Sequence, residues 1–278
     1  MDELPVRGPA VHGLGLPLPP QQMPRIRDGR PLKRWRYLGV YTPELMLCVG
    51  NARVGPVPQR WWAVALPGGT LLEQTSIRRG GLEVGLGRAR VDARATRNGE
   101  RVSIELELGD RPPVEVVSPH GTSYIWTAKR APVHVRGRVQ VDDRRWHLEG
   151  DHGLIDDSAG YHARRTAWRW SAGVGRSTDG RHVAWNLVDG VHDAPSASER
   201  TLWIDGEPRE VEPQQFAPDL SRVGGLTFEP WSTREHSMSL GLMRSRYSQP
   251  FGTFTGELPG GLALVEGYGV MEDHDVTW

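Results

Sequence analysis

The stretch VSIELEL, residues 102–108, decides the fold class, because its apolar and polar residues alternate one by one. This period of two is that of an extended strand with one buried face and one face in water. The stretch VHVRGRVQV, residues 133–141, repeats the pattern and places His134 on the polar, solvent-exposed face. Both stretches predict strands of an antiparallel sheet.

Turn-forming residues separate the predicted strands. GLEVGLGRARVDARA, residues 81–95, also alternates but changes phase at Gly87, which predicts a glycine bulge that lets one strand curl. Asn98-Gly99 then predicts a primed hairpin turn that leads into the opening stretch. Asp205-Gly206 predicts a further reversal within RTLWIDGE. Tight reversals between short strands are typical of antiparallel β proteins.

Short apolar runs make up much of the remaining chain. WRYLGVY, LMLCVG and WWAVAL, which begin at Trp35, Leu45 and Trp61, predict strands in a sheet core. MSLGLMRSRYS, from Met238, is compatible with a helix or a strand, and its glycine favours a strand. No stretch carries the apolar stripe of a long helix. The sequence therefore predicts an all-β barrel or sandwich with few short helices.

Composition and charge exclude several classes of protein. The chain has 278 residues, a formal net charge of zero and one cysteine, Cys48, so we expect no intrachain disulfide and no nucleic-acid partner. No apolar segment is long enough for a transmembrane helix, and the first residues lack the pattern of a secretory signal. Residues 1–30 are rich in Pro and Gly and are predicted to form an extended arm. We expect a cytoplasmic protein, whose oligomeric state the sequence leaves open.

Residues 146–186 contain the richest mixture of reactive and apolar side chains, including four tryptophans. That mixture is typical of a ligand pocket. In extended strands, the period of two places an arginine and two tryptophans on one face, and a histidine and an asparagine on one face of the next strand. The ligand-binding candidates are Arg164, Trp168, Trp170, His182 and Asn186. The alternative interpretation is a structural aromatic ladder in the sheet core.

Four side chains are candidate acids and bases. Asp156 and Asp157 lie in IDDSAGY, which looks like a turn, so they are expected either to cap backbone N–H groups or to enter an apolar barrel. Burial in a barrel would raise the pKa of such a carboxyl and make it a general acid for an alkene or epoxide, with a tryptophan face stabilising the cation. Glu272 and His274 share one face of the last predicted strand, as an acid–base pair or as a surface ion pair.

The sequence indicates neither a metal site nor an organic cofactor. It lacks a pair of cysteines and an H-E-x-x-H motif, and Gly13-Leu14-Gly15 is too short for a dinucleotide fingerprint. Neither lysine follows the glycine pattern of a phosphate-binding loop, and no complete G-x-S-x-G motif is present. We therefore expect no metal and no cofactor.

Five sequence blocks follow one another over residues 31–278. They are PLKRWRYLGVYTPELMLCVGNARVGP, WWAV, IDDSAGYHARRTAWRWSAG, LWIDGE and the ending QPFGTFTGELPGG with EGYGVMEDHDVTW. Together they resemble domain-of-unknown-function family 2804 (DUF2804). A shorter pattern is similar to hydroxyneurosporene synthase and AttH-like proteins, and it consists of Asp156, Gly160, Trp168, Trp170 and residues 179–181.

The more distant similarity implies two lipocalin-like antiparallel halves, residues 31–145 and 146–278, with an apolar cavity between or within them. Some proteins of that group hydrate, cyclise or isomerise lipophilic substrates. The resemblance also implies that Trp168 and Trp170 lie beside the pocket and that Asp156 or Asp157 is an acid.

These features predict a protein that binds a small lipophilic molecule in a β-barrel pocket and catalyses hydration, isomerisation or cyclisation without a cofactor. Two alternatives stay open. One is a carrier that binds the lipophile and does no chemistry. The other is a carbohydrate-active β protein, although no pair of carboxylates at catalytic spacing can be assigned.

Overall fold

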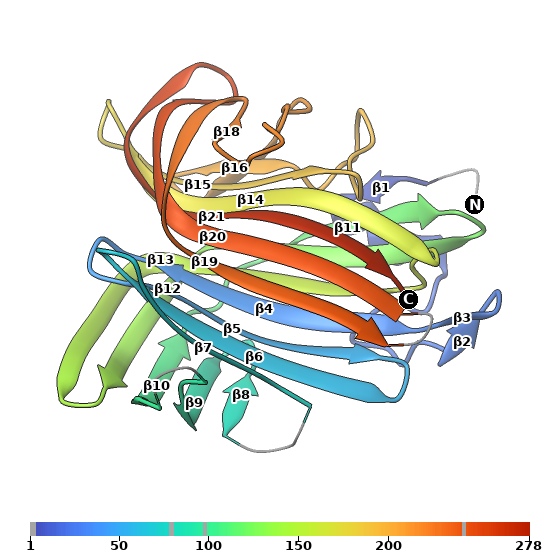
Figure 1. Ribbon diagram of the computed structural model, residues 1–278. Helices are drawn as coiled ribbons and strands as arrows, with labels where there is room; N and C mark the ends of the chain where they lie inside the picture. Colours follow the sequence, from blue (N-terminus) through green and yellow to red (C-terminus); the bar gives the residue numbers. More distant parts are fainter. Residues whose placement is uncertain (1–3, 78–80, 97–98, 241–242) are drawn as a thin grey trace.

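The computed structural model describes residues 4–77, 81–96, 99–240 and 243–278, and in this part of the chain almost all regular structure is β-strand (Figure 1). Two antiparallel sheets lie one over the other. A 3-10 helix, η1 (Gly8–Leu14), and a small ladder of β2 (Ile26–Arg27) with β3 (Arg30–Pro31) belong to the N-terminal segment. The predicted all-β class with few short helices is confirmed.

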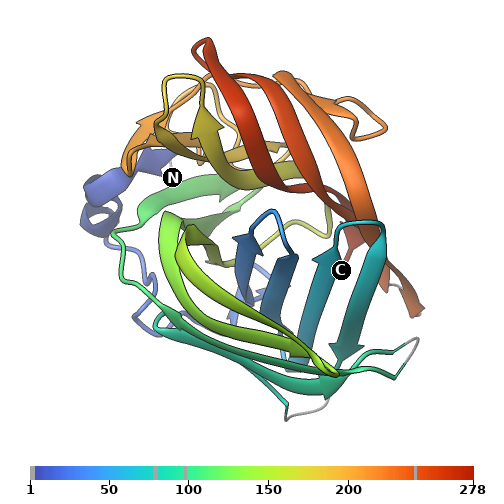
Figure 2. The ribbon, with the colours of Figure 1, turned by 90° about the vertical axis from the view of Figure 1, so that its left-hand side faces the viewer.

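The first sheet contains eleven of the described strands. They are β1 (Val6–Arg7), β4 (Lys33–Tyr41), β5 (Met46–Val54), β6 (Val57–Leu66), β7 (Thr70–Ser76), β8 (Leu82–Val84), β9 (Arg88–Arg94), β10 (Arg101–Leu108), β11 (Val114–His120), β12 (Ser123–Val141) and β13 (Arg144–Gly160). Their order is β7-β6-β5-β4-β13-β12-β10-β9-β8, and β11 pairs with both β12 and β1. Figure 2 shows this sheet curling into a half-barrel.

The second sheet contains eight of the described strands and lies over the first (Figure 2). They are β14 (Arg165–Ser177), β15 (His182–Asp189), β16 (Thr201–Ile204), β17 (Glu207–Glu210), β18 (Arg222–Val223), β19 (Gly225–Leu240), β20 (Met243–Leu258) and β21 (Leu262–Thr277). Their order is β17-β16-β15-β14-β21-β20-β19-β18. The last strand of the chain, β21, is therefore central, between β14 and β20.

Strands β4, β5 and β6 are buried on both faces, which explains their continuous apolar runs. One face, with Leu47 and Val49, packs inside the half-barrel against residues of β10 and β12. The other face, with Met46 and Cys48, packs against the second sheet. One core thus lies inside the first sheet and another lies between the sheets, and the core between the sheets continues into the cavity described below. Further clusters lie within the second sheet and under the N-terminal segment.

Two sequence predictions about turns differ in outcome. At Asp205-Gly206 both residues have positive φ, 52° and 85°, and they join β16 to β17, so the predicted reversal is confirmed. The predicted bulge at Gly87 is wrong, because β8 and β9 are separate strands that pair with each other across residues 85–87. The change of phase marks a chain reversal there, since Gly85 N–H bonds Arg88 O at 2.8 Å. The predicted Asn98-Gly99 turn lies partly outside the described residues.

The N-terminal segment packs against the end of the first sheet. Val11, Leu18 and Met23 are buried against Tyr124 and Tyr161. The chain passes from the first sheet to the second between residues 160 and 165, where β13 ends and β14 begins. The division into an arm, 1–30, and two halves that meet at residues 145 and 146 stays a prediction about domains. Within the described residues, no helix has the length and apolar character needed to cross a membrane.

Candidate functional site

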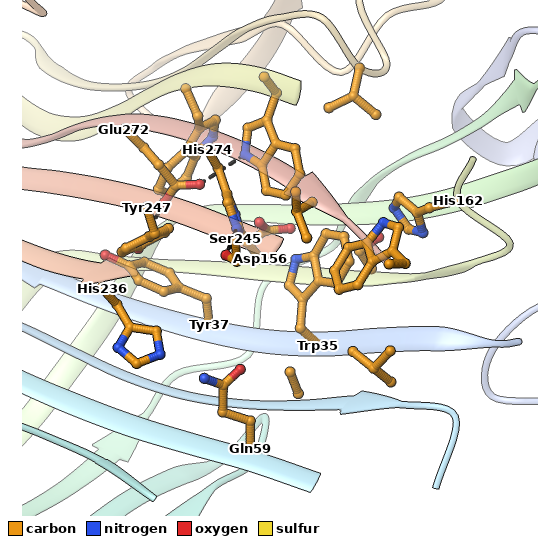
Figure 3. A pocket seen from close by; sticks show the side chains of 18 of the residues that line it. Trp35, Tyr37, Gln59, Asp156, His162, His236, Ser245, Tyr247, Glu272 and His274 are labelled. Carbon is orange, nitrogen blue, oxygen red and sulfur yellow. Dashed lines mark hydrogen bonds between the residues drawn. The ribbon is translucent and has the colours of Figure 1, made fainter. Parts of the chain in front are cut away.

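A cavity of about 230 Å³ lies between the two sheets. Strands β4, β5, β6, β12 and β13 contribute to one wall, and β14, β19, β20 and β21 contribute to the other (Figure 3). The lining residues Val57 and Ile77 are 52% and 70% exposed, so they mark where the cavity opens to solvent. Most of the lining surface is apolar, which is the usual character of a small-molecule pocket, although about half of the lining residues carry a polar or charged group.

Indole rings from both sheets form an aromatic wall. Trp35 of β4 and Trp168 of β14 stack with 6.3 Å between ring centroids and 5° between ring planes. Trp170 follows on the same face of β14, and its ring meets the edge of Tyr37 at 5.5 Å. The period of two along β14 therefore brings both predicted tryptophans into the cavity. Trp35, which the sequence did not mark, completes the wall.

Glu272 lies beside this wall and is buried, with 8% of the residue exposed. Its Oε1 accepts a hydrogen bond from Trp168 Nε1 at 2.8 Å, and its Oε2 accepts from Tyr247 Oη and Gln249 Nε2, each at 3.0 Å. Burial raises the pKa of Glu272 to about 7, although the bonds from Trp168 and Tyr247 oppose that rise. The carboxyl is thus able to both release and take a proton near neutral pH.

His274 lines the same cavity one strand period further on. Its Nε2 is 2.9 Å from Ser245 Oγ, and its ring centroid is 4.4 Å from that of Trp168. Burial, with a smaller effect from the nearby Arg234, lowers the pKa of His274 to about 3, so the ring is neutral. In the described structure Glu272 and His274 share the face predicted for them, and each bonds other side chains instead of its neighbour.

A buried ion cluster forms part of the cavity lining. Lys129 Nζ lies 2.6 Å from Asp156 Oδ1 and 3.2 Å from Glu199 Oε1. Burial disfavours the charged ammonium, but the two carboxylates outweigh it and raise the pKa of Lys129. Asp156 consequently anchors a cation at the site.

The two neighbouring aspartates point to opposite faces of β13. The expectation that they lie in a turn is wrong, because β13 continues through them and pairs with both β12 and β4. Asp157 faces away from the cavity and pairs with Arg36 at 2.6 Å and Arg130 at 3.1 Å. Acidic residues are tolerated in this buried strand because each has a cationic partner.

The remaining ligand-binding candidates do not line the cavity. Arg164 and His182 are exposed. Asn186 is buried behind Trp170, whose Nε1 donates to Asn186 Oδ1 at 2.7 Å, and Asn186 Nδ2 donates to Glu199 O at 2.9 Å. The structure therefore brings together Asp156, Trp168, Trp170, Glu272 and His274, and it leaves Asp157, Arg164, His182 and Asn186 outside the lining.

Lys129 is a functional candidate that sequence reasoning missed, although the sequence contains a signal for it. Lysine occurs only at Lys33 and Lys129, whereas every other basic side chain is arginine. Both lysines are buried, at 1% and 3% exposed. Because this chain has lysine only at buried positions, the rarity of lysine in the sequence is a signal that Lys33 and Lys129 have specific partners inside the protein. Among the described residues, no group of three or more His, Cys, Asp or Glu side chains is placed to hold a metal ion.

Comparison with known proteins gives one family and several structures. The family model described as "Domain of unknown function (DUF2804)" matches residues 57–278. A candidate AttH from Nitrosomonas europaea is 14% identical, with 94% of this chain and 98% of that chain covered and a TM-score of 0.47. Kievitone hydratase from Nectria haematococca is 8% identical over 87% and 88% of the two chains, with a TM-score of 0.43. The protein CghA, with Sch210972, is 12% identical over 88% of each, with a TM-score of 0.39. No curated protein matches the chain.

Proposed function

This chain belongs to the DUF2804 family, as its sequence blocks predicted, and we propose that it binds a small lipophilic molecule between its sheets and moves a proton on that molecule through Glu272. The reaction class is hydration, isomerisation or cyclisation without an organic cofactor. The observation that carries the proposal is a carboxyl buried beside an aromatic wall, with a pKa raised to about 7.

The lining supports a lipophilic ligand. Several of its charged side chains are neutralised in ion pairs, since Lys129 pairs with Asp156 and Glu199, and Arg234 pairs at 3.3 Å with Glu73, which lies outside the lining. Since most of the lining surface is apolar, a ligand meets mainly apolar groups, whose burial contributes roughly 25 cal/mol for each Å² removed from water.

Glu272 is suited to general acid–base catalysis because its pKa lies near neutral pH. In the proposed step, the π electrons of a ligand alkene take the Glu272 proton, and a carbocation forms at the neighbouring carbon. The faces of Trp168 and Trp35 stabilise that positive charge. Water then adds and returns a proton to Glu272, or a proton on an adjacent carbon returns to Glu272 and the double bond has moved.

A carrier without chemistry is the second candidate. It is favoured by the three hydrogen bonds that Glu272 accepts, since such a carboxyl also serves to hold Trp168, Tyr247 and Gln249 in place. The two candidates differ in one measurable respect, because a carrier binds the lipophile and leaves its C–H bonds unchanged.

Deuterium incorporation in heavy water distinguishes the candidates without knowledge of the natural substrate. Enones, β,γ-unsaturated ketones and terpenoid alkenes are incubated with the protein and recovered, and mass spectrometry measures their deuterium content. We expect Glu272→Gln to lower incorporation by about 10²-fold or more, while it still binds the neutral dye N-phenyl-1-naphthylamine.

The matched control is Glu115→Gln. Glu115 Oε1 also accepts from an indole, Trp126 Nε1 at 3.0 Å, but Glu115 lies outside the cavity lining. We expect this variant to keep wild-type incorporation. Dye binding without incorporation by any compound would favour the carrier, and absence of dye binding would overturn the lipophile pocket itself.

A further inference from the structure

The end of the cavity next to His162 differs in chemistry from the end next to Glu272. Figure 3 shows His162 at one side of the lining, beyond Trp35, and Glu272, Tyr247 and His274 at the other side. His162 is 1% exposed and its ring lies 6.3 Å from that of Trp278, which also lines the cavity. We call this region the histidine end, and its lining residues are His162, His192, Glu199 and Trp278.

Four buried polar atoms at the histidine end form no hydrogen bond with any described residue. They are His162 Nδ1, His192 Nε2, Glu199 Oε2 and Trp278 Nε1. Leaving a buried polar group unpaired costs folding free energy, and such groups are few in native proteins. Four of them at one end of a cavity indicate a place where a ligand group completes the bonding.

Backbone and side-chain contacts hold these atoms in position. Glu199 N–H donates to His192 O at 3.0 Å, and His192 Nδ1 lies 2.9 Å from Ser118 Oγ. Glu199 Oε1 is engaged by Lys129, so its Oε2 is the free acceptor. Lys33 Nζ donates to His162 O at 3.2 Å, which fixes the backbone beneath the ring.

The four atoms include both donors and acceptors. Trp278 Nε1 only donates and Glu199 Oε2 only accepts. Burial lowers the pKa of His162 and of His192 well below the ordinary histidine value, so both rings are neutral. A neutral imidazole presents either N–H or a bare nitrogen, depending on its tautomer, and each ring adapts to its partner.

We propose that the histidine end binds a hydroxyl group of the ligand, so that the ligand is a lipophilic alcohol; this rests on the proposed lipophile pocket. A hydroxyl donates to Glu199 Oε2 and accepts from Trp278 Nε1 or from an imidazole N–H. A ketone or an ether has no proton for Glu199. A carboxylate would lie against the carboxylates of Glu199 and Asp156, and like charges repel.

Matched probes test the hydroxyl directly. Decan-2-ol, decan-2-one, 2-methoxydecane and decanoate compete with N-phenyl-1-naphthylamine for the wild-type cavity, and dye fluorescence gives each affinity. We expect decan-2-ol to bind about tenfold more tightly than the ketone and the ether, because only the alcohol pairs with the buried acceptor. Decanoate is expected to bind more weakly than decan-2-ol.

Two variants change the polar atoms of the histidine end. Glu199→Gln keeps the shape of the side chain but replaces the free acceptor with an amide N–H, because the amide oxygen stays on the Lys129 ammonium, which can only donate. Trp278→Phe removes the indole N–H together with part of the ring. In Glu199→Gln we expect the advantage of the alcohol over the ketone and the ether to fall to about twofold or less, and in Trp278→Phe we expect the alcohol to bind more weakly than in the wild type. The control is Glu149→Gln, since Glu149 is exposed and pairs with His134 and Arg136 outside the lining.

The outcomes separate this inference from the proposed function. Three results overturn the hydroxyl site and leave the lipophile pocket standing. They are equal affinity for all neutral probes, tighter binding of decanoate than of decan-2-ol, and an alcohol preference that survives in Glu199→Gln. Failure of every probe and of the dye to bind overturns the pocket, and the hydroxyl site with it.

Discussion

Trp168 Nε1 donates a hydrogen bond to Glu272 Oε1 at 2.8 Å, so one contact links the aromatic wall to the carboxyl that is proposed to move a proton. The two residues come from neighbouring strands, β14 and β21, whose register places Trp168 opposite His274 and Trp170 opposite Glu272. The bond is therefore diagonal across the ladder, and a change in either side chain acts on the other.

Removal of this donor is expected to raise the pKa of Glu272. A hydrogen bond to the carboxylate favours the ionised form, so Trp168→Phe should move the pKa above its value of about 7 by roughly one unit. Carbon-13 NMR of labelled glutamate carboxyls measures the shift. Trp185→Phe is the control, because Trp185 donates to Ser171 Oγ at 3.1 Å in the core of the second sheet. If the pKa of Glu272 is the same in Trp168→Phe and Trp185→Phe, the hydrogen bond from Trp168 does not stabilise the carboxylate.

The raised pKa of Glu272 predicts a specific dependence of stability on pH. The unfolded carboxyl ionises near pH 4.5, whereas the folded one keeps its proton to about pH 7. Its stabilising contribution is therefore complete below pH 4.5 and is lost as the pH rises through 7, by about 3 kcal/mol. Urea unfolding at a series of pH values should show this loss in the wild type relative to Glu272→Gln. Parallel pH profiles of the two proteins would show that the carboxyl titrates normally.

His274 predicts the opposite slope. Its pKa falls from 6.5 to about 3 on folding, so its contribution is present above pH 6.5 and is lost as the pH falls toward 3. The loss amounts to about 5 kcal/mol if the ring stays as buried as it is here. His274→Gln should thus unfold less readily in acid than the wild type, relative to neutral pH. Urea unfolding at a series of pH values measures this difference. If the stability of the wild type and of His274→Gln falls equally between pH 6.5 and pH 3, the prediction is contradicted.

Local patterns predicted the strands and part of the site, because strand period depends on neighbouring residues alone. The period of two placed Trp168 and Trp170 on one face, and it placed Glu272 beside His274. It did not place the partners. Trp35 contacts Trp168 only because the two sheets pack face to face, and the sequence of neither strand predicts that packing.

Two of the sequence predictions were wrong for the same physical reason, because contacts between strands decide both structures. The phase change at Gly87 is equally compatible with a bulge in one strand and with a turn between two, and only the pairing of β8 with β9 decides. The acids Asp156 and Asp157 suggested a turn because carboxylates are costly inside a sheet. Their cationic partners, Lys129 and Arg36, come from other strands.

Loss of Lys129 should destabilise the fold strongly. Its side chain is 4% exposed and lies between Asp156 and Glu199, so Lys129→Met leaves two buried carboxylates without their cation. We expect a loss of about 3–5 kcal/mol in the free energy of unfolding. Arg88→Met is the control, since Arg88 and its partner Glu83 are largely exposed, and it should change stability little. Similar effects of the two substitutions would mean that the buried cluster contributes no more than a surface pair.

Filling the cavity should abolish binding and leave the fold intact. Ala52 of β5 is half-buried, lines the cavity and lies opposite Trp35 in the ladder, so Ala52→Trp places an indole in the space of about 230 Å³ that a ligand would occupy. The new ring enters open space instead of a packed core, which limits the strain that overpacking causes. We expect at least a tenfold loss in affinity for N-phenyl-1-naphthylamine with a thermal midpoint near that of the wild type. Ala167→Trp, on the exposed face of β14, adds the same ring outside the cavity and should bind the dye normally. Unchanged dye binding by Ala52→Trp would place the dye, and with it the proposed ligand site, elsewhere on the molecule.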